Sequence, residues 1–310
     1  NGQVLLGDPA TANAWSMLLA KQSAKQIIED IDPVSLPKAQ KNDTELSGIR
    51  ACHIRDGVAV SRFLAWLDAE VDANRFYHEG ELADKLETFR LLGDNYLELS
   101  FDTISAAGGN AAMCHYNHND STPKLMTNNS IYLVDSGAHY LDGSTDVTRT
   151  VAIGKVTNEQ IKMATLVLKG HIALAQMKFP HGTSGQHLDA FARQYLWQHG
   201  YDYAHGTGHG VGHYLNVHEG PQRIAKFNSE VALLPGMIVS IEPGYYREGK
   251  FGIRHENLYF VKESESLAGA EIPILEFEVL TYVPFDQKLV DKALLSQSEI
   301  NWLNNYHRKV

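Results

Sequence analysis

Apolar residues recur every three or four positions over several long stretches of this 310-residue chain, which is the spacing of one face of an α-helix. The first stretch ends before Asp32-Pro33, because a proline cannot continue a helix, and the second follows Asp43, a residue suited to a helix N-cap. Capping motifs at residues 157–160 and 296–299 mark two later helix starts. The pattern predicts helices at residues 11–31, 43–71, 80–92, 157–179 and 184–199, and a last helix after residue 296.

Short apolar runs with polar punctuation separate these helices and indicate strands. They lie at residues 96–101, 111–116, 130–135, 146–153, 237–242, 256–262 and 276–283. From residue 41 onward the order is helices, strands, helices, strands and a helix. Runs of one kind of element are typical of an α+β fold with an antiparallel or mixed sheet, and the twofold recurrence predicts two similar halves.

A domain boundary is predicted at residues 32–41, where ten residues (DPVSLPKAQK) contain two prolines. Residues before about 40 are therefore expected to belong to something upstream of the main domain.

Composition and charge narrow the classes of partner. The 27 basic and 37 acidic residues give a formal net charge of −10, which argues against a surface that tracks nucleic-acid phosphates. No apolar run reaches the length of about 18 residues that a transmembrane helix needs. The two cysteines, Cys52 and Cys114, are too few for a disulfide framework and favour a reducing compartment such as the cytoplasm.

Four acids lie at the ends of predicted strands: Asp135, Asp146, Glu242 and Glu256. Each alone has an ordinary explanation as a turn residue. Together, four carboxylates beside apolar strands would repel one another and lose hydration unless they were protonated or bound to cations. The set therefore predicts a divalent metal site.

Histidines supply the other candidate ligands. His209 lies in a glycine-rich stretch (HGTGHGVG, 205–212) that permits close backbone approach, whereas His115, His205 and His218 would each, taken alone, be ordinary surface or core residues. One histidine with four carboxylates is an oxygen-rich set that favours Mn, Co or Mg over a cysteine-rich zinc site, with zinc still possible. Five such ligands suit two ions, which can activate a water for hydrolysis.

Four segments together resemble the pita-bread metallopeptidases, in particular their Xaa-Pro aminopeptidase branch. They are DSGAHYLDGSTDVTRT (135–150), HGTGHGVGHYLNVHEGP (205–221), IEPGYY (241–246) and GIRHEN (252–257). The resemblance extends from about residue 36 to 310. It implies a pita-bread fold with two similar halves around a central curved sheet, and release of an N-terminal residue that precedes proline.

The resemblance also implies roles for single residues. Asp135, Asp146, His209, Glu242 and Glu256 would be the metal ligands, with Asp146 and Glu256 bridging two divalent ions. Glu242 would also accept the proton of the attacking water. His115, His205 and His218 would face the substrate as catalytic residues, and Arg254 and Tyr246 would line its binding pocket. The cofactor implied is Mn, with Zn or Co as alternatives.

The family further implies domains and partners. Residues 1–36 would be the end of an upstream non-catalytic domain plus linker, and 37–310 a catalytic domain with a C-terminal cap. Proline-containing peptides are the expected substrates, with no nucleic acid or membrane partner and a possible homodimer. Two alternatives stay open: a prolidase acting on Xaa-Pro dipeptides, and a non-enzymatic pita-bread module that binds peptides.

Overall fold

The computed structural model describes residues 2–120, 122–265, 267 and 269–310. Its helices are α1 (Ala14–Ser23), α2 (Ser35–Ala39), α3 (Asp43–Asp72), α4 (Glu79–Arg90), α5 (Asn158–Ala175), α6 (Gly185–Trp197) and α7 (Gln297–His307). Three short 3-10 helices are η1 (Gly108–Ala112), η2 (Gln287–Leu289) and η3 (Lys292–Leu294). Its strands are β1 (Val4–Gly7), β2 (Gln26–Glu29), β3 (Tyr96–Leu99), β4 (Ile104–Ala107), β5 (Ser130–Ser136), β6 (Ala138–Tyr140), β7 (Gly143–Ser144), β8 (Val147–Ile153), β9 (Lys178–Pro180), β10 (Gly208–His209), β11 (Arg223–Ile224), β12 (Ile238–Ile241), β13 (Gly244–Arg247), β14 (Phe251–Arg254), β15 (Asn257–Glu263) and β16 (Ile274–Val279).

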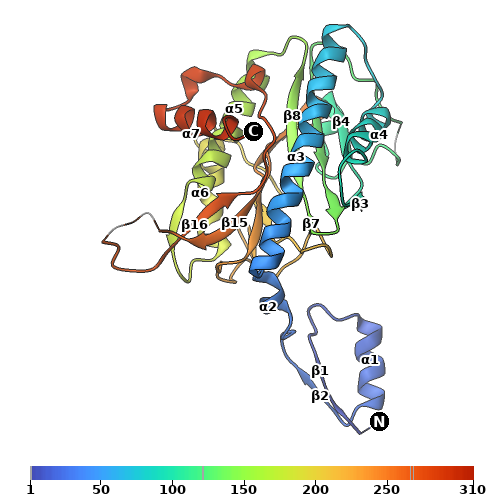
Figure 1. Ribbon diagram of the computed structural model, residues 1–310, viewed down its shortest axis with the longest axis vertical. Coiled ribbons are helices and arrows are strands. Elements are labelled where there is room, and N and C mark those ends of the chain that lie inside the picture. The colour runs from blue at the N-terminus through green and yellow to red at the C-terminus, as the bar shows by residue number, and fades with distance from the viewer. Residues whose placement is uncertain (1, 121, 266, 268) are drawn as a thin grey trace.

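The N-terminal elements β1, α1 and β2 form a small unit that projects from the rest of the chain (Figure 1). The two strands pair in parallel, with Leu5 opposite Ile27. Helix α1 buries none of its residues, and Trp15 is 66% exposed. The helix predicted over 11–31 is therefore wrong beyond Ser23, because pairing with β1 draws the following segment into a strand.

The predicted boundary at 32–41 contains the short helix α2 and contacts the main body. The backbone N–H of Lys41 donates to the carbonyl of Gly236 at 2.8 Å. Lys38 Nζ lies 3.1 Å from Glu219 Oε2, so the linker is joined to the body by an ion pair as well.

The first half of the body places α3 and α4 against the antiparallel sheet β4-β5-β8. The capping box of α3 uses Asn42 and Glu45, so the N-cap lies one residue before the predicted Asp43. Apolar residues from both helices and the sheet interlock, which buries the face that the helical spacing predicted. They include Phe63, Leu67, Leu82, Leu86, Tyr132 and Val147.

The second half repeats this plan with α5 and α6 against the antiparallel sheet β12-β15-β16-β9. Its core includes Leu174, Leu188, Val239, Tyr259 and Val261. Two helices on an antiparallel sheet thus occur twice, which confirms the predicted α+β class with two similar halves. In the described part of the chain, the strands of the body, from β3 onward, form several small hydrogen-bonded sheets.

Two further predicted elements differ from the structure, and one hairpin was not predicted. Residues 111–116 are not a strand, since η1 and a turn occupy this region, and the strand is the preceding β4, which pairs with β5. The helix predicted to 179 ends at Ala175, and β9 follows it. The hairpin β13-β14, with Tyr246 opposite Gly252, was not predicted.

The C-terminal helix α7 packs near α5 (Figure 1), and its Leu303 and Tyr306 share a core with Leu168 and Ile172 of α5. Within the described residues, no helix combines the length and apolarity needed to cross a bilayer.

Candidate metal centre

The four predicted acids come together in one cleft of about 450 Å³ at the junction of the two halves. Asp135 lies near the end of β5, and Asp146 directly precedes β8, the strand that pairs with β5. Glu242 directly follows β12, and Glu256 directly precedes β15, its partner strand. The N–H of Glu256 donates to the carbonyl of Thr148 at 3.1 Å, so one hydrogen bond joins the two halves at the acids.

His209 completes this group from β10. Its ring Nδ1 lies 3.0 Å from the carbonyl of Gly210, which can only accept, so Nδ1 carries a proton and Nε2 is the ring nitrogen that faces the acids. That Nε2 is 3.3 Å from Asp146 Oδ2 and 3.6 Å from Glu242 Oε1. The backbone N–H of His209 donates to the Ser240 hydroxyl at 3.0 Å, which holds the residue against β12.

The electrostatics of the cleft disfavour four ionised acids. Burial, together with the charges of Asp135 and Glu242, raises the pKa of Asp146 well above its usual value. Burial and the nearby Glu256 raise the pKa of Glu242 to about 8. Burial and Asp146 likewise raise the pKa of Glu256 well above its usual value. The protein alone therefore leaves this cluster short of positive charge.

The donor set fits divalent cations. Ligand atoms of Asp135, Asp146 and Glu256 lie within 4.8 Å of one another, and so do those of His209, Glu242 and Glu256. The two groups share Glu256, as a bridging carboxylate between two ions requires. The buried Oδ1 of Asp135 has no hydrogen-bond partner among the described residues, and a cation would satisfy it. Carboxylate oxygens and one imidazole suit hard or borderline divalent ions.

All three other predicted histidines line the same cleft. The His218 ring meets that of His209 edge to face, with 4.2 Å between centroids, and His218 is also within ligand reach of Asp146. Burial and the charge of His209 lower the pKa of His218 to about 4. Burial and Arg254 lower the pKa of His205 to about 3, so both rings are neutral near pH 7.

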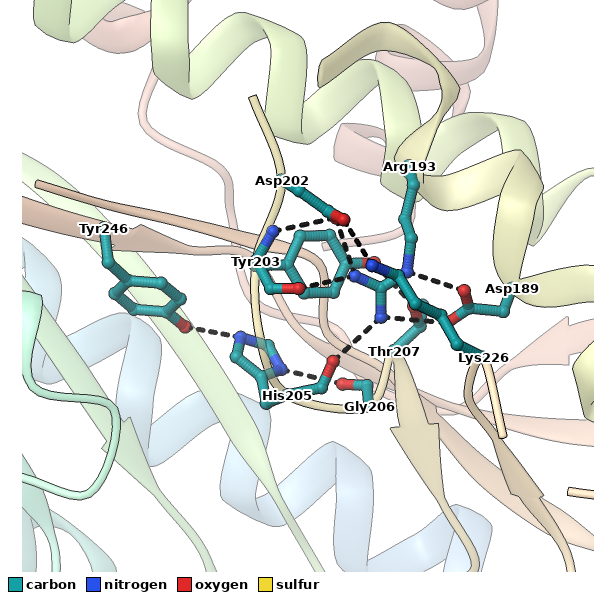
Figure 2. Close-up of polar contacts among 9 residues, drawn as sticks. All are labelled: Asp189, Arg193, Asp202, Tyr203, His205, Gly206, Thr207, Lys226 and Tyr246. Carbon is teal, nitrogen blue, oxygen red and sulfur yellow. Dashed lines mark hydrogen bonds and ion pairs between the residues drawn. The ribbon is translucent and has the colours of Figure 1, made fainter. Parts of the chain in front are cut away.

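The loop that carries His205 is held by a buried arginine on α6, as Figure 2 shows. Arg193 pairs with Asp189 one turn earlier, at 2.6 Å, and donates to the carbonyls of Tyr203 and His205 at 2.7 and 2.8 Å. The Thr207 hydroxyl donates to Asp189 at 2.6 Å. One ion pair thereby positions the segment from Tyr203 to Thr207 at the edge of the cleft.

The two predicted pocket residues occupy different positions. Arg254 lines the cleft and forms a short ion pair with Asp135. Tyr246 lies beside His205, with its hydroxyl 2.8 Å from His205 Nε2 (Figure 2). The same hydroxyl accepts from Arg254 Nη1 at 2.8 Å. Both ring nitrogens of His205 are therefore engaged within the protein, since its Nδ1 lies 2.7 Å from the carbonyl of Gly206.

Sequence reasoning missed several residues that support the centre. The Thr148 hydroxyl donates to Glu256 Oε2 at 2.6 Å. Arg149, fully buried, donates to the carbonyl of Glu256 at 2.6 Å and to the Tyr306 hydroxyl on α7 at 3.0 Å. Cys114 lines the cleft beside His115. The motif TDVTRT contained Thr148 and Arg149, but only the packing of β8 on β15 and α7 gives them these partners.

Comparison with known proteins gives two family matches. Residues 47–263 match metallopeptidase family M24, and residues 273–310 match the C-terminal region of peptidase M24. The probable Xaa-Pro aminopeptidase P of Paracoccidioides brasiliensis (strain Pb03) is 48% identical over 305 residues, which are 97% of this chain and 50% of that protein. The chain thus spans about half the length of the curated relatives it matches.

Two solved structures are similar to this one. The X-prolyl aminopeptidase of Caenorhabditis elegans, described as a cytosolic enzyme with a dinuclear active site, is 45% identical with a TM-score of 0.90 over 100% of this chain and 49% of that one. The Xaa-Pro dipeptidase of Bacillus anthracis is 27% identical with a TM-score of 0.75 over 92% of this chain and 74% of that one. The predicted pita-bread fold is confirmed by these likenesses.

Proposed function

Because this chain belongs to metallopeptidase family M24, we propose that it carries the catalytic part of a metal-dependent aminopeptidase. Its substrates would be peptides with proline in the second position, from which it releases the first residue. The observation that carries the proposal is the pair of ligand groups sharing Glu256 inside a histidine-lined cleft. The names of the relatives at 48% and 45% identity support the proline preference.

The proposed ligands are the five residues predicted from the sequence. Asp135, Asp146 and Glu256 would hold one divalent cation, and His209, Glu242 and Glu256 the other, with Asp146 close enough to His209 to bridge as well. Bound divalent ions would supply Lewis acidity, which lowers the pKa of water and polarises the peptide carbonyl.

The chain's own residues would handle the proton and the peptide. Glu242 would take the proton of the attacking water at a carboxylate oxygen and deliver it to the proline nitrogen, which leaves as an amine. The Ser240 hydroxyl donates to Glu242 Oε1 at 3.2 Å and orients that carboxylate. His115 and the neutral His218 at the cleft wall would hydrogen-bond the peptide, while Tyr246 and Arg254 would fix the ring of His205.

The proposed domains follow the same interpretation. Residues 1–36 would be the end of an upstream non-catalytic domain plus linker, and 37–310 the catalytic domain with its C-terminal cap. The exposed apolar side chains of the N-terminal unit support this, among them Val4, Leu6, Trp15 and Leu18. A cytoplasmic location, Mn as the resident metal and a homodimer are further proposals that rest on the family resemblance.

The test uses the full-length protein, stripped of metal and reloaded with Mn, Zn or Co in turn. We expect cleavage of Xaa-Pro-Xaa tripeptides and longer peptides, and little cleavage of matched Xaa-Ala-Xaa peptides. Good cleavage of Xaa-Pro dipeptides without cleavage of tripeptides would instead establish the prolidase alternative. Peptide binding without cleavage under all three metals would favour the non-enzymatic module.

A further inference from the structure

Glu79, the first residue of α4, is a fully buried acid outside the metal centre. Its carboxylate accepts from the backbone N–H groups of Ala107 and Lys124, both at 2.7 Å. It also accepts from the Tyr116 hydroxyl at 2.7 Å and from the Asn110 amide at 3.0 and 3.1 Å. No lysine, arginine or histidine of the described chain forms an ion pair with it. Neutral donors alone satisfy this buried charge.

These donors all lie on the segment that runs from the last residue of β4 to β5, most of which is a loop at the cleft. Ala107 and Asn110 lie at its start, Tyr116 in its middle and Lys124 near its end, and His115 is the neighbour of Tyr116. Apart from the short η1, the described residues between β4 and β5 form turns and one isolated bridge, from Leu125 to His78. Hydrogen bonds to a single carboxylate therefore hold this loop in place of the regular secondary structure that it lacks.

The burial of Glu79 is costly unless every donor is in place. An unpaired buried carboxylate loses several kcal/mol of hydration, and bonds from N–H and O–H groups to an ionised acceptor are about twice as strong as neutral ones. The first turn of α4 adds the positive end of the helix dipole. Glutamine would keep the shape but turn an NH2 group toward these donors, so part of the loop would lose its partner.

The second half of the fold holds its own histidine loop in a comparable way. There the buried Arg193 of α6 collects the carbonyls of Tyr203 and His205 (Figure 2), whereas Glu79 of α4 collects N–H and O–H groups around His115. In both cases one buried charge on a neighbouring helix binds the backbone of a loop that lines the cleft.

We propose that Glu79 is a positioning residue that sets the place of His115 in the cleft. It does not touch the substrate and acts through the loop. This inference rests on the proposed function for its kinetic consequence, but its structural consequence, the ordering of the His115 loop, is independent of activity.

The kinetic test is a double-mutant cycle in the full-length, metal-loaded protein. Glu79→Gln should lower kcat/KM for an Xaa-Pro-Xaa peptide at least tenfold with unchanged metal content. His115→Ala should lower it by a similar or larger factor, and the double variant should be no worse than His115→Ala alone, because both changes remove the same interaction. Glu87→Gln, on the same helix but bonded to Tyr96, is the matched control and should leave kcat/KM unchanged. Additive losses, or an unchanged Glu79→Gln protein, would overturn the proposal.

Two further measurements test the role of Glu79 if the first variant does not fold or the protein shows no activity. If Glu79→Gln does not fold, Tyr116→Phe removes one of the donors to Glu79 together with the hydroxyl that accepts from Asn110, and its smaller loss should again vanish in the His115→Ala background. Hydrogen exchange of the amides of Ala107 and Lys124 should speed up at least tenfold in Glu79→Gln and stay unchanged in Glu87→Gln. If the wild-type protein cleaves no peptide, the proposed function fails and exchange alone decides: equal protection in both variants would refute the role of Glu79.

Discussion

Two groups of buried carboxylates in this molecule have opposite surroundings. Asp56 is buried beside Arg90, whose Nε donates to it at 2.8 Å, and the Tyr140 hydroxyl adds a bond at 2.9 Å. Asp146 and Glu256 are equally buried but face other acids, so their pKa values rise. Burial is the largest cause for both; the charges of Asp135 and Glu242 follow for Asp146, and those of Asp146 and Asp135 for Glu256.

We call the Asp56–Arg90 pair the closed network, because its charges balance within the chain, and the four cleft acids the open cluster, because their charges do not. The Asp56–Arg90 pair is neutral as a unit and needs nothing from outside the chain. The cleft acids have Arg254 as a partner for Asp135, but this one charge does not neutralise four carboxylates. A cation from outside the chain therefore binds most favourably beside buried carboxylates whose charge the chain itself does not balance.

Glu242→Gln gives the largest expected effect. Loss of the proton acceptor should lower kcat for Xaa-Pro-Xaa peptides by about 10²- to 10⁴-fold. Because one of the mutually repelling charges is gone, the metal-free variant should be at least as stable as metal-free wild type. Steady-state kinetics measure kcat, urea unfolding measures the stability, and metal analysis checks that the variant retains its metal. A variant that keeps its metal and wild-type turnover would exclude Glu242 as the base; His209→Ala should instead lose metal first.

Asp56→Asn tests the closed network. It leaves the fully buried Arg90 without its carboxylate, so the free energy of unfolding should fall by about 3–5 kcal/mol. Asp68→Asn is the matched control, because Asp68 pairs with Lys288 at the surface and should cost no more than about 1 kcal/mol. Urea unfolding of the metal-free proteins gives both values. Equal, small losses would mean that the Asp56–Arg90 pair is not a stabilising unit.

Metal removal tests the open cluster directly. A cation present at 100 times its Kd stabilises the folded state by about 2.7 kcal/mol, so chelation should lower Tm and readdition should restore it. The shift should be the same in Asp56→Asn, whose substitution lies outside the cluster. An unchanged Tm after verified removal of metal would contradict the dinuclear interpretation.

The smallest expected effect is a pH dependence from His171. Burial and the charge of Arg149 lower its pKa to about 3, while the unfolded chain binds the proton near pH 6.5. Between these values the unfolded state holds one more proton, so stability falls as pH falls, by up to about 1.4 kcal/mol per pH unit. In His171→Gln, the free energy of unfolding of the metal-free protein should depend less steeply on pH between pH 6 and 4.5, by the equivalent of about one proton. Urea unfolding at several pH values measures this slope. Identical slopes would show that His171 is not the group responsible.

The local sequence was sufficient to predict the elements that local interactions stabilise. The long helix α3 has apolar spacing over its whole length and a capping box at its start, and α5 has the same two signals. The end of the helix predicted over 11–31 failed because β2 exists through pairing with β1, about twenty residues away. The strand predicted at 111–116 failed because the acceptor for Tyr116 and Asn110 is Glu79, more than thirty residues earlier.

For the site, the pattern of four acids with His209 predicted a metal-ligand set, and the family resemblance added His115, His205 and His218. Every predicted ligand lines the cleft. The supporting residues could not be predicted, since nothing in the letters says that Thr148 meets Glu256 or that Arg193 meets the His205 carbonyl. Tyr246 was predicted as a pocket residue, but its hydroxyl faces His205 and Arg254.

The position of Arg149 bears on chimeras in which the C-terminal segment of this chain is exchanged for that of a relative. Its guanidinium binds the Glu256 carbonyl on one side and the Tyr306 hydroxyl on the other, and so crosses from the region matched over 47–263 to the one matched over 273–310. A chimera that takes its C-terminal segment from a distant relative would exchange one acceptor of this arginine along with it. The tail and the cleft are thus joined in the structure through one side chain, although family comparison divides them in two.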